Sequence, residues 1–258
     1  MPRVVLALVL VVAALAAGCV QPAKRGPDRA AFDDGYAAFQ AGQWQRSIDL
    51  FNKYLRSDPL TATRGEVYYY RGEAQIHLKR RNDALADFER AIGAKAAPPI
   101  DAFARVAIGN LYYEEGNDAG AAAAYAEALK LPPKELPIDQ VLLRMGVSLQ
   151  RLGKWAMADK YLQHLIDAYP TSPSVPEARR RLHADAFAVQ TGAFAAQTTA
   201  DIEAGRLRQA GFTPRIGQAQ RSARTLYTVQ VGKARTFCEA QELARRLGGA
   251  GFSTVIVP

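Results

Sequence analysis

The stretch RVAIGNLYYEEGNDAGAAAAYAEALKLPP (Arg105–Pro133) decides the fold of more than half of this 258-residue chain. Gly109 and Ala121 are small enough to let two antiparallel helices approach closely, and the ring of Tyr125 fills the groove beside them. Pro133 stops the second helix because proline lacks the backbone N–H that a helix needs. The stretch therefore predicts a helical hairpin.

The same pattern returns every 37 residues, in four copies. Each copy has a glycine, a small residue twelve positions later and a large apolar residue four positions further on. The three sets are Gly35, Gly72, Gly109 and Gly146; Ser47, Ala84, Ala121 and Ala158; and Phe51, Phe88, Tyr125 and Leu162. The copies end at Pro59, Ala96, Pro133 and Pro170. The first copy departs from the pattern, since Ala38 and Tyr54 stand where it expects an aromatic and a small residue. This register predicts an α-helical solenoid of about four hairpins.

These residues resemble the tetratricopeptide repeat over about Arg29 to Pro170. The usual repeat has about 34 residues, so we expect the three additional residues of each copy in the loop after its second helix. The following segment, TSPSVPEARRRLHA, predicts a capping helix that begins at Ser174 or Pro176. A solvated cap also accounts for the basic run Arg179–Arg181.

The resemblance implies that the first helices of the repeats line a concave face that binds a protein or peptide. In phase with the glycines, this face should present Tyr69, Glu73, Val106, Asn110, Tyr113, Leu143 and Val147. Aromatic and hydrogen-bonding side chains suit protein recognition, so we expect Tyr69, Glu73, Asn110 and Tyr113 to contact the partner. A simple spacer is the alternative.

The N-terminal residues predict a signal peptide. Arg3 precedes the apolar run Val4–Ala17, which is too short to span a membrane. An ordinary secretory signal is one reading, but Cys19 after Gly18 resembles a bacterial lipobox, with Ala16 in place of the usual leucine. That resemblance implies lipidation of Cys19 and anchoring in the outer membrane, facing the periplasm.

The expected organisation is a signal peptide (1–18), a lipidated cysteine and linker (19–28), a repeat domain with its cap (29–184) and a C-terminal domain (186–258). Few residues separate the cap from the C-terminal domain, so we expect the two domains to keep a fixed relative orientation.

Cys238 has no second thiol to pair with in the mature chain, and we expect it to be a packed apolar residue. The net charge of +8 is spread along the chain and would suit an anionic cell-wall environment.

The sequence of the C-terminal domain contains an internal duplication. FAVQTGAF (Phe187–Phe194) and YTVQVGKA (Tyr227–Ala234) share Val-Gln-x-Gly at an offset of 40 residues, and Arg-Leu-x-x-Ala-Gly-Phe also repeats at this offset. Each half reads as strand, helix and strand, with Gly211 and Gly251 ending the helices. The expected fold is a βαββαβ unit of α+β class, with a four-stranded antiparallel sheet and two helices on one face.

FAVQTGAF and its echo resemble the SPOR domain of bacterial envelope proteins. The resemblance implies binding of peptidoglycan glycan strands stripped of their stem peptides, on the sheet face that the helices leave open. Gln190 matches the recurrent glutamine of the family motif, and Ala193 matches the small residue three positions later. The side-chain amide of Gln190 offers donors and an acceptor to sugar hydroxyl and acetamido groups. The alternative is that Gln190 is only a solvated residue on an exposed sheet face.

Strand alternation extends this expected site. If Val189, Thr191, Val229 and Val231 face the helices, then Ala188, Gln190, Leu226, Thr228 and Gln230 face outward. The expected glycan-binding residues are Gln190, Ala193, Leu226, Thr228 and Gln230.

Two departures from the family pattern bear on this site. Thr228 stands where members commonly carry arginine, and Gly232-Lys233-Ala234 replaces Gly-Pro-Phe. Arg215, Arg224 and Arg235 are candidates to supply the missing donor.

Other functions fit the sequence less well. An RNA-recognition module needs exposed aromatics on its sheet, but Phe187 and Tyr227 share the phase of the buried valines, so we expect no nucleic acid. His77, His164 and His183 are far apart in sequence, and no catalytic motif, metal-ligand spacing or cofactor loop is present. We therefore expect a non-enzymatic protein without metal or cofactor, acting in cell division or envelope maintenance. The alternative is an envelope-assembly scaffold whose SPOR-like domain no longer binds glycan.

Overall fold

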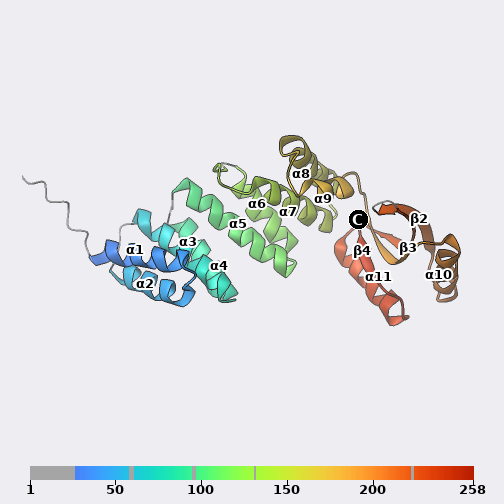
Figure 1. Ribbon diagram of the computed structural model, residues 1–258, viewed down its shortest axis with the longest axis horizontal. Helices are drawn as coiled ribbons and strands as arrows, with labels where there is room; N and C mark the ends of the chain where they lie inside the picture. The colour runs from blue at the N-terminus through green and yellow to red at the C-terminus, as the bar shows by residue number, and fades with distance from the viewer. Residues whose placement is uncertain (1–26, 58–60, 95–96, 131, 222–223) are drawn as a thin grey trace, which may run out of the picture.

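The protein is an extended array of helical hairpins followed by a small α+β domain (Figure 1). The computed structural model describes residues 27–57, 61–94, 97–130, 132–221 and 224–258. The predicted signal peptide and lipidation site Cys19 lie outside these residues. In the described residues, no helix is both long enough and apolar enough to cross a membrane.

Four helical hairpins and a cap make up the first domain. The hairpins are α1 (Pro27–Gln40) with α2 (Trp44–Arg56), α3 (Thr61–His77) with α4 (Arg81–Gly93), α5 (Pro98–Glu115) with α6 (Asp118–Ala128), and α7 (Ile138–Arg151) with α8 (Trp155–Ala168). The short helix α9 (Val175–Arg181) packs on α8 and starts after Ser174, which confirms the predicted capping helix. The predicted solenoid is confirmed.

The repeated glycines allow the close approach that the sequence predicts. A Cβ atom built on Gly109 would lie 2.5 Å from the Tyr125 ring, and one on Gly72 would lie 2.7 Å from the Phe88 ring. Gly35 and Gly146 meet their large residues in the same way. All four small residues of the pattern are fully buried. Each glycine therefore makes room for the large side chain sixteen positions later.

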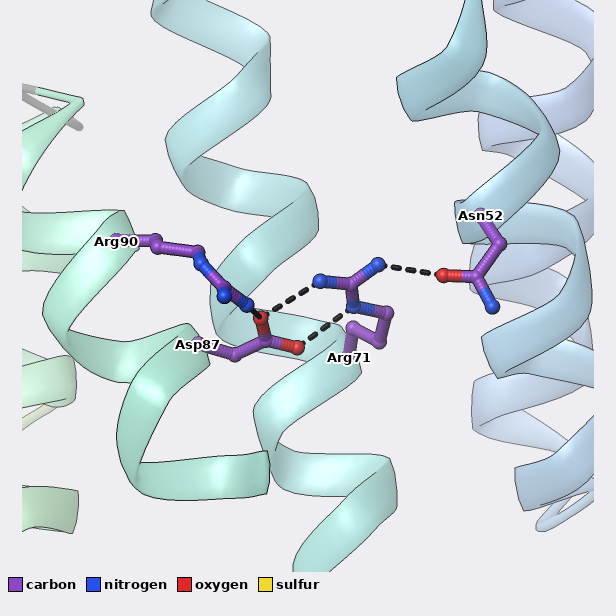
Figure 2. A network of polar contacts seen from close by, with 4 residues as sticks. All are labelled: Asn52, Arg71, Asp87 and Arg90. Atoms are coloured by element: carbon purple, nitrogen blue, oxygen red, sulfur yellow. Dashed lines mark hydrogen bonds and ion pairs between the residues drawn. The ribbon is translucent and has the colours of Figure 1, made fainter. Parts of the chain in front are cut away.

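A network of polar contacts joins the first two repeats (Figure 2). Arg71 of α3 donates from Nε and Nη2 to the two carboxylate oxygens of Asp87 of α4, both at 2.6 Å. Its Nη1 donates to Asn52 of α2 at 2.5 Å, and Arg90 donates to the same Asp87 carboxylate at 2.8 Å. The Asp87 side chain is completely buried, so this fully paired carboxylate is a structural element of the solenoid.

The C-terminal domain has the predicted βαββαβ order. Its elements are β1 (Phe187–Phe194), α10 (Gln197–Gln209), β2 (Pro214–Arg221), β3 (Arg224–Ala234), α11 (Phe237–Gly249) and β4 (Val255–Val257). The strands lie in the order β2-β3-β1-β4, and every neighbouring pair is antiparallel. Both helices pack on one face of the sheet, over a core that includes Val189, Val229, Leu207 and Leu247. The predicted fold class is confirmed.

The two halves of this domain exchange equivalent contacts. The Arg206 guanidinium lies 5.4 Å from the ring centre of Phe252, and the Arg246 guanidinium lies 5.9 Å from that of Phe212. These residues correspond at the offset of 40 seen in the sequence, so each half covers the aromatic ring of the other. The duplication thus produces a pair of halves that pack on each other.

The end of the solenoid packs directly on the C-terminal domain. The Trp155 Nε1 donates to the backbone oxygen of Arg235 at 3.0 Å, and its ring lies 4.8 Å from that of Phe187. The Arg151 guanidinium lies 4.8 Å from the ring centre of Tyr113 in the repeats and 4.9 Å from that of Phe237 in α11. These contacts give a physical basis for a fixed relation between the domains, which stays a prediction.

Cys238 is exposed, so the prediction that it is packed is wrong. The buried positions of α11 are Ala240 and Leu247. Cys238 lies two residues before Ala240, which puts it on the opposite side of a helix with 3.6 residues per turn.

Candidate functional site

One row of paired residues crosses all four strands on the sheet face that the helices leave open. Val255 of β4 pairs with Gln190 of β1, Gln190 pairs with Gln230 of β3, and Gln230 pairs with Arg215 of β2. Directly paired residues of antiparallel strands have their side chains on the same face. Val231, beside Gln230 in the chain, faces the helices, so this row faces away from them. The row therefore places two amides and a guanidinium side by side.

A second row beside it is made of small residues. Ala193 pairs with Thr228, and Thr228 pairs with Gly217. Beyond this row, Leu226 pairs with Ala219. We call the whole surface the open face: it consists of the polar row, the row of small residues and the pair beyond it.

A β-bulge in β1 brings Ala193 to the open face. Strict alternation would give Ala193 the same direction as Val189, which is fully buried under the helices. However, Gln190 pairs with Gln230 while Gly192 pairs with Val229, so Thr191 is an additional residue in β1. The bulge reverses the alternation after Thr191.

Two residues expected to be exposed on the open face are buried instead. Thr228 is only 7% exposed and lies in the central strand β3, between Ala193 of β1 and Gly217 of β2. Ala188 is 5% exposed and pairs with Val257 of β4. The hydroxyl of Thr228 lies close to Gly217, where a Cβ atom would be 3.2 Å away. Thr228 thus forms the floor of the open face rather than a projecting group.

Arg215 is the candidate arginine that lies beside the two glutamines. It is exposed, and in the described part of the chain it has no hydrogen bond or ion pair. Arg235 instead lies at the junction of the domains, and Arg224 begins β3 at the far end of the sheet. Within the described ranges, the side chains of Gln190 and Gln230 also make no hydrogen bond, so all three polar groups are available to a ligand.

The first helices of neighbouring repeats contact one another and line a common face. The structure places Tyr69 and Glu73 on α3, and Asn110 and Tyr113 on α5, with each side chain partly exposed. Val106 and Val147 are buried, so their expected presentation to a partner is wrong. Val106 packs against α7 of the following repeat, which covers it. Leu143 packs with the residues under the cap.

Two of the predicted partner-binding residues are already engaged. Asn110 Oδ1 accepts from Tyr125 at 2.8 Å and from Arg144 Nη1 at 2.6 Å. The Tyr113 ring lies under Arg151 at the junction with the C-terminal domain. Both therefore contribute to packing between repeats or domains, and their role in binding stays a prediction.

Sequence reasoning missed a group of touching aromatic rings, of which five come from the first helices α1, α3 and α5 and one, Trp44, begins α2. The group, which we call the aromatic belt, consists of Tyr36, Phe39, Trp44, Tyr69, Tyr70 and Phe103. Each ring is partly exposed, and neighbouring ring centres are 4.8–6.1 Å apart. The repeat did carry a signal for one member of this group. Tyr36 precedes Glu73 by one period of 37 residues, so it occupies the position in the first repeat that Glu73 occupies in the second.

Glu73 lies one helical turn beyond Tyr69. Burial raises the pKa of its carboxyl from 4.5 to about 7. Burial, together with the negative charge of Glu73, raises the pKa of Tyr69 well above its usual value. The described ranges contain no cluster of three or more His, Cys, Asp or Glu side chains that could hold a metal ion.

Comparison with protein families identifies both parts. Residues 184–258 match the model of the SPOR domain. The C-terminal unit is a SPOR domain. Residues 104–135 and 140–172 match models of the tetratricopeptide repeat, so the solenoid is a TPR array. SPOR domains in general bind peptidoglycan, and TPR arrays bind proteins or peptides, so both are binding modules rather than enzyme families.

Similar solved structures include MamA and YrrB. A structure of MamA from AMB-1 is 18% identical, covers 60% of this chain and 78% of its own, and has a TM-score of 0.49. The structure of YrrB, described as a TPR protein with an unusual peptide-binding site, is 21% identical, covers 59% of this chain and 74% of its own, and has a TM-score of 0.49. No curated protein matches the sequence.

Proposed function

We propose that this chain is a non-enzymatic lipoprotein of the outer membrane that faces the periplasm. Its SPOR domain binds glycan strands of peptidoglycan that lack stem peptides, and its TPR array recruits a protein. The pair would act together in cell division or envelope maintenance. The sequence around Cys19 supports the anchor, and the two families support the two binding activities.

The single observation that carries the glycan-binding proposal is the row Gln190–Gln230–Arg215 on the open face. Two amides offer donors and acceptors, and a guanidinium offers donors only, which together suit the hydroxyl and acetamido groups of a glycan. In the neighbouring row, Ala193 and Gly217 are exposed on either side of the buried Thr228, so their short side chains leave the polar row open to a ligand from this side.

Arg215 also accounts for the loss of arginine at position 228. Thr228 and Arg215 lie on adjacent strands, and Arg215 is paired with Gln230, two residues along from Thr228. A guanidinium that reaches from β2 can therefore act over the same part of the open face as one from β3. We infer that the donor has moved to the neighbouring strand rather than disappeared.

The junction between the domains leaves this face accessible. Its contacts involve the start of β1, the end of β3 and the start of α11, through Phe187, Arg235 and Phe237. In the described residues, no hydrogen bond or ion pair links the open face to the TPR array. We therefore expect a glycan strand and a protein partner to be able to bind at the same time.

The test is sedimentation of the full-length chain with purified cell-wall sacculi, untreated or treated with an amidase that removes stem peptides. We expect preferential sedimentation with treated sacculi, and a loss of roughly tenfold in affinity for Gln190→Ala or Arg215→Ala. Arg208→Ala, which removes an exposed arginine from α10 on the helix side, is the matched control and should bind normally. Absence of sedimentation with either wall would favour the second candidate, a protein-binding scaffold whose SPOR domain does not bind glycan.

A further inference from the structure

The aromatic belt forms a continuous surface across the first three repeats. Tyr36 of α1 lies 4.8 Å from Tyr70 of α3, Tyr70 lies 5.3 Å from Tyr69, and Tyr69 lies 6.1 Å from Phe103 of α5, measured between ring centres. Since each ring keeps part of its surface exposed, the belt is available to a ligand. The negatively polarised faces of aromatic rings attract cations.

Glu73 supplies a negative charge beside this belt. It follows Tyr69 by four residues and Tyr70 by three on α3, the spacing that brings side chains together on one helix face. The side chain is partly exposed, and among the described residues it forms no hydrogen bond or ion pair. Desolvation without a partner destabilises the ionised carboxylate, which is consistent with a pKa raised to about 7.

The arginine closest to Glu73 in the sequence, Arg71, already binds other side chains. Arg71 directs Nε and Nη2 to Asp87 and Nη1 to Asn52, as Figure 2 shows. One repeat therefore contains two carboxylates in opposite conditions: Asp87 is buried and fully paired, whereas Glu73 is partly exposed and unpaired. An external cation would supply the partner that Glu73 lacks.

The other repeats do not reproduce this arrangement. The positions equivalent to Glu73 are Tyr36, Asn110 and Val147. Tyr36 belongs to the belt, Val147 is buried, and the Asn110 carbonyl oxygen is already bonded to Tyr125 and Arg144. The carboxylate is therefore a local feature of the second repeat, not a consequence of the repeat pattern.

We propose that Glu73 and the rings of Tyr69 and Tyr70 form a binding site for a cationic side chain, the ammonium of lysine or the guanidinium of arginine, presented by the recruited protein. This inference rests on the proposed protein-recruiting function of the TPR array and specifies its ligand. The concave face thus selects a basic segment, since the carboxylate repels acidic segments and the rings contact the apolar stem that carries the cation.

The test is isothermal titration calorimetry of the full-length chain with three short peptides blocked at both ends. One alternates alanine and lysine, the second carries Nε-acetyl-lysine at the same positions, and the third carries glutamate. We expect binding of the lysine peptide, with affinity at least about tenfold lower for the other two. Glu73→Gln should remove this preference, and Tyr70→Leu should weaken binding of the lysine peptide.

Glu89→Gln is the matched control, because Glu89 is exposed on α4 of the same repeat and its substitution changes the net charge equally. It should leave all three affinities unchanged. Equal binding of the three peptides, or unchanged selectivity in Glu73→Gln, would overturn the cation site while leaving peptide recruitment intact. Binding of none of them would overturn the cation site as well. Sedimentation with sacculi, measured on the same preparation, reports independently on the glycan-binding function.

Discussion

The two domains use internal duplication in opposite ways. In the TPR array, successive copies stack in a line, and what they share is the packing of a glycine against a large side chain. The positions that face a partner differ from copy to copy, as Tyr36, Glu73, Asn110 and Val147 demonstrate. In the SPOR domain, the two copies pack on each other, and the shared motif itself meets across the sheet, where Gln190 pairs with Gln230.

This difference indicates how each binding face arises. Stacking fixes the scaffold and leaves individual positions free to acquire a distinct chemistry, such as the unpaired carboxylate of Glu73. Pairing of two copies instead doubles a functional group, so that one glutamine per copy produces two adjacent amides. Substitutions in the TPR array should therefore act strongly on stability where they touch shared packing, and those in the SPOR open face should act on binding.

The largest expected effect concerns the paired carboxylate of the second repeat. Arg71→Met removes the bidentate partner of the fully buried Asp87 and leaves only Arg90 beside it. We expect the free energy of unfolding of the TPR array to fall by about 4 kcal/mol, the typical result of leaving a buried charge without its main partner. Urea unfolding followed by circular dichroism measures this loss. A loss below about 1 kcal/mol would contradict the structural role assigned to the network.

A pair of glycine substitutions tests the shared packing. A Cβ atom on Gly109 would lie 2.5 Å from the Tyr125 ring, so Gly109→Ala should destabilise the TPR array by about 2 kcal/mol through overpacking. Gly205→Ala in α10 meets no atom within 4 Å and should stabilise the SPOR domain by about 0.5 kcal/mol, because alanine favours helix. Thermal unfolding of both variants gives the comparison, and similar shifts of the same sign would refute it.

The carboxylate of Glu73 should have a pH-dependent effect on stability. Because its pKa is raised from 4.5 to about 7, the folded state binds more protons than the unfolded state between these values. Stability therefore falls as the pH rises through this window, and Glu73→Gln should be more stable than the parent by about 2 kcal/mol at pH 8. The difference should vanish near pH 4. An equal difference at both pH values would mean that ionisation of Glu73 is not its cause.

The smallest expected effect concerns the contacts exchanged between the SPOR halves. Arg246→Ala removes a cation from above the Phe212 ring, and Arg206→Ala removes the equivalent cation from above Phe252. Each substitution should destabilise the SPOR domain by about 0.5 kcal/mol, since both arginines are exposed. Arg206→Ala also removes the ion pair of Arg206 with Glu203, so chemical denaturation should give a loss at least as large as that of Arg246→Ala. A clearly larger loss in Arg246→Ala would break the symmetry.

The packing of the solenoid was predictable because it follows from helical periodicity and one repeated spacing. The register of Gly109 with Tyr125 appears in the sequence and is confirmed in the structure. The duplicated SPOR strands were also predictable from a repeated spacing, because Val-Gln-x-Gly returns at an offset of 40 residues. Features that depend on how separate elements meet were not predictable: the bulge at Thr191 becomes visible only when β1 is paired with β3.

Burial on the binding faces was also hidden from the sequence. Val106 shares the helical phase of Asn110 but is covered by the next repeat, and Thr228 faces outward yet lies below its neighbours. The aromatic belt was missed because its rings come from three repeats whose relative positions a helical phase does not give. The choice of Arg215 over Arg224 and Arg235 likewise required the strand register.

The most direct test of the glycan-binding account is an NMR titration of the full-length chain with soluble glycan strands freed of stem peptides by an amidase. The side-chain amide signals of Gln190 and Gln230 and the guanidinium signal of Arg215 should shift together, with the backbone signals of Ala193 and Thr228. Signals from the helix side, such as that of Gln241 in α11, should stay in place. Shifts confined to the helix side, or none at saturating glycan, would contradict the account.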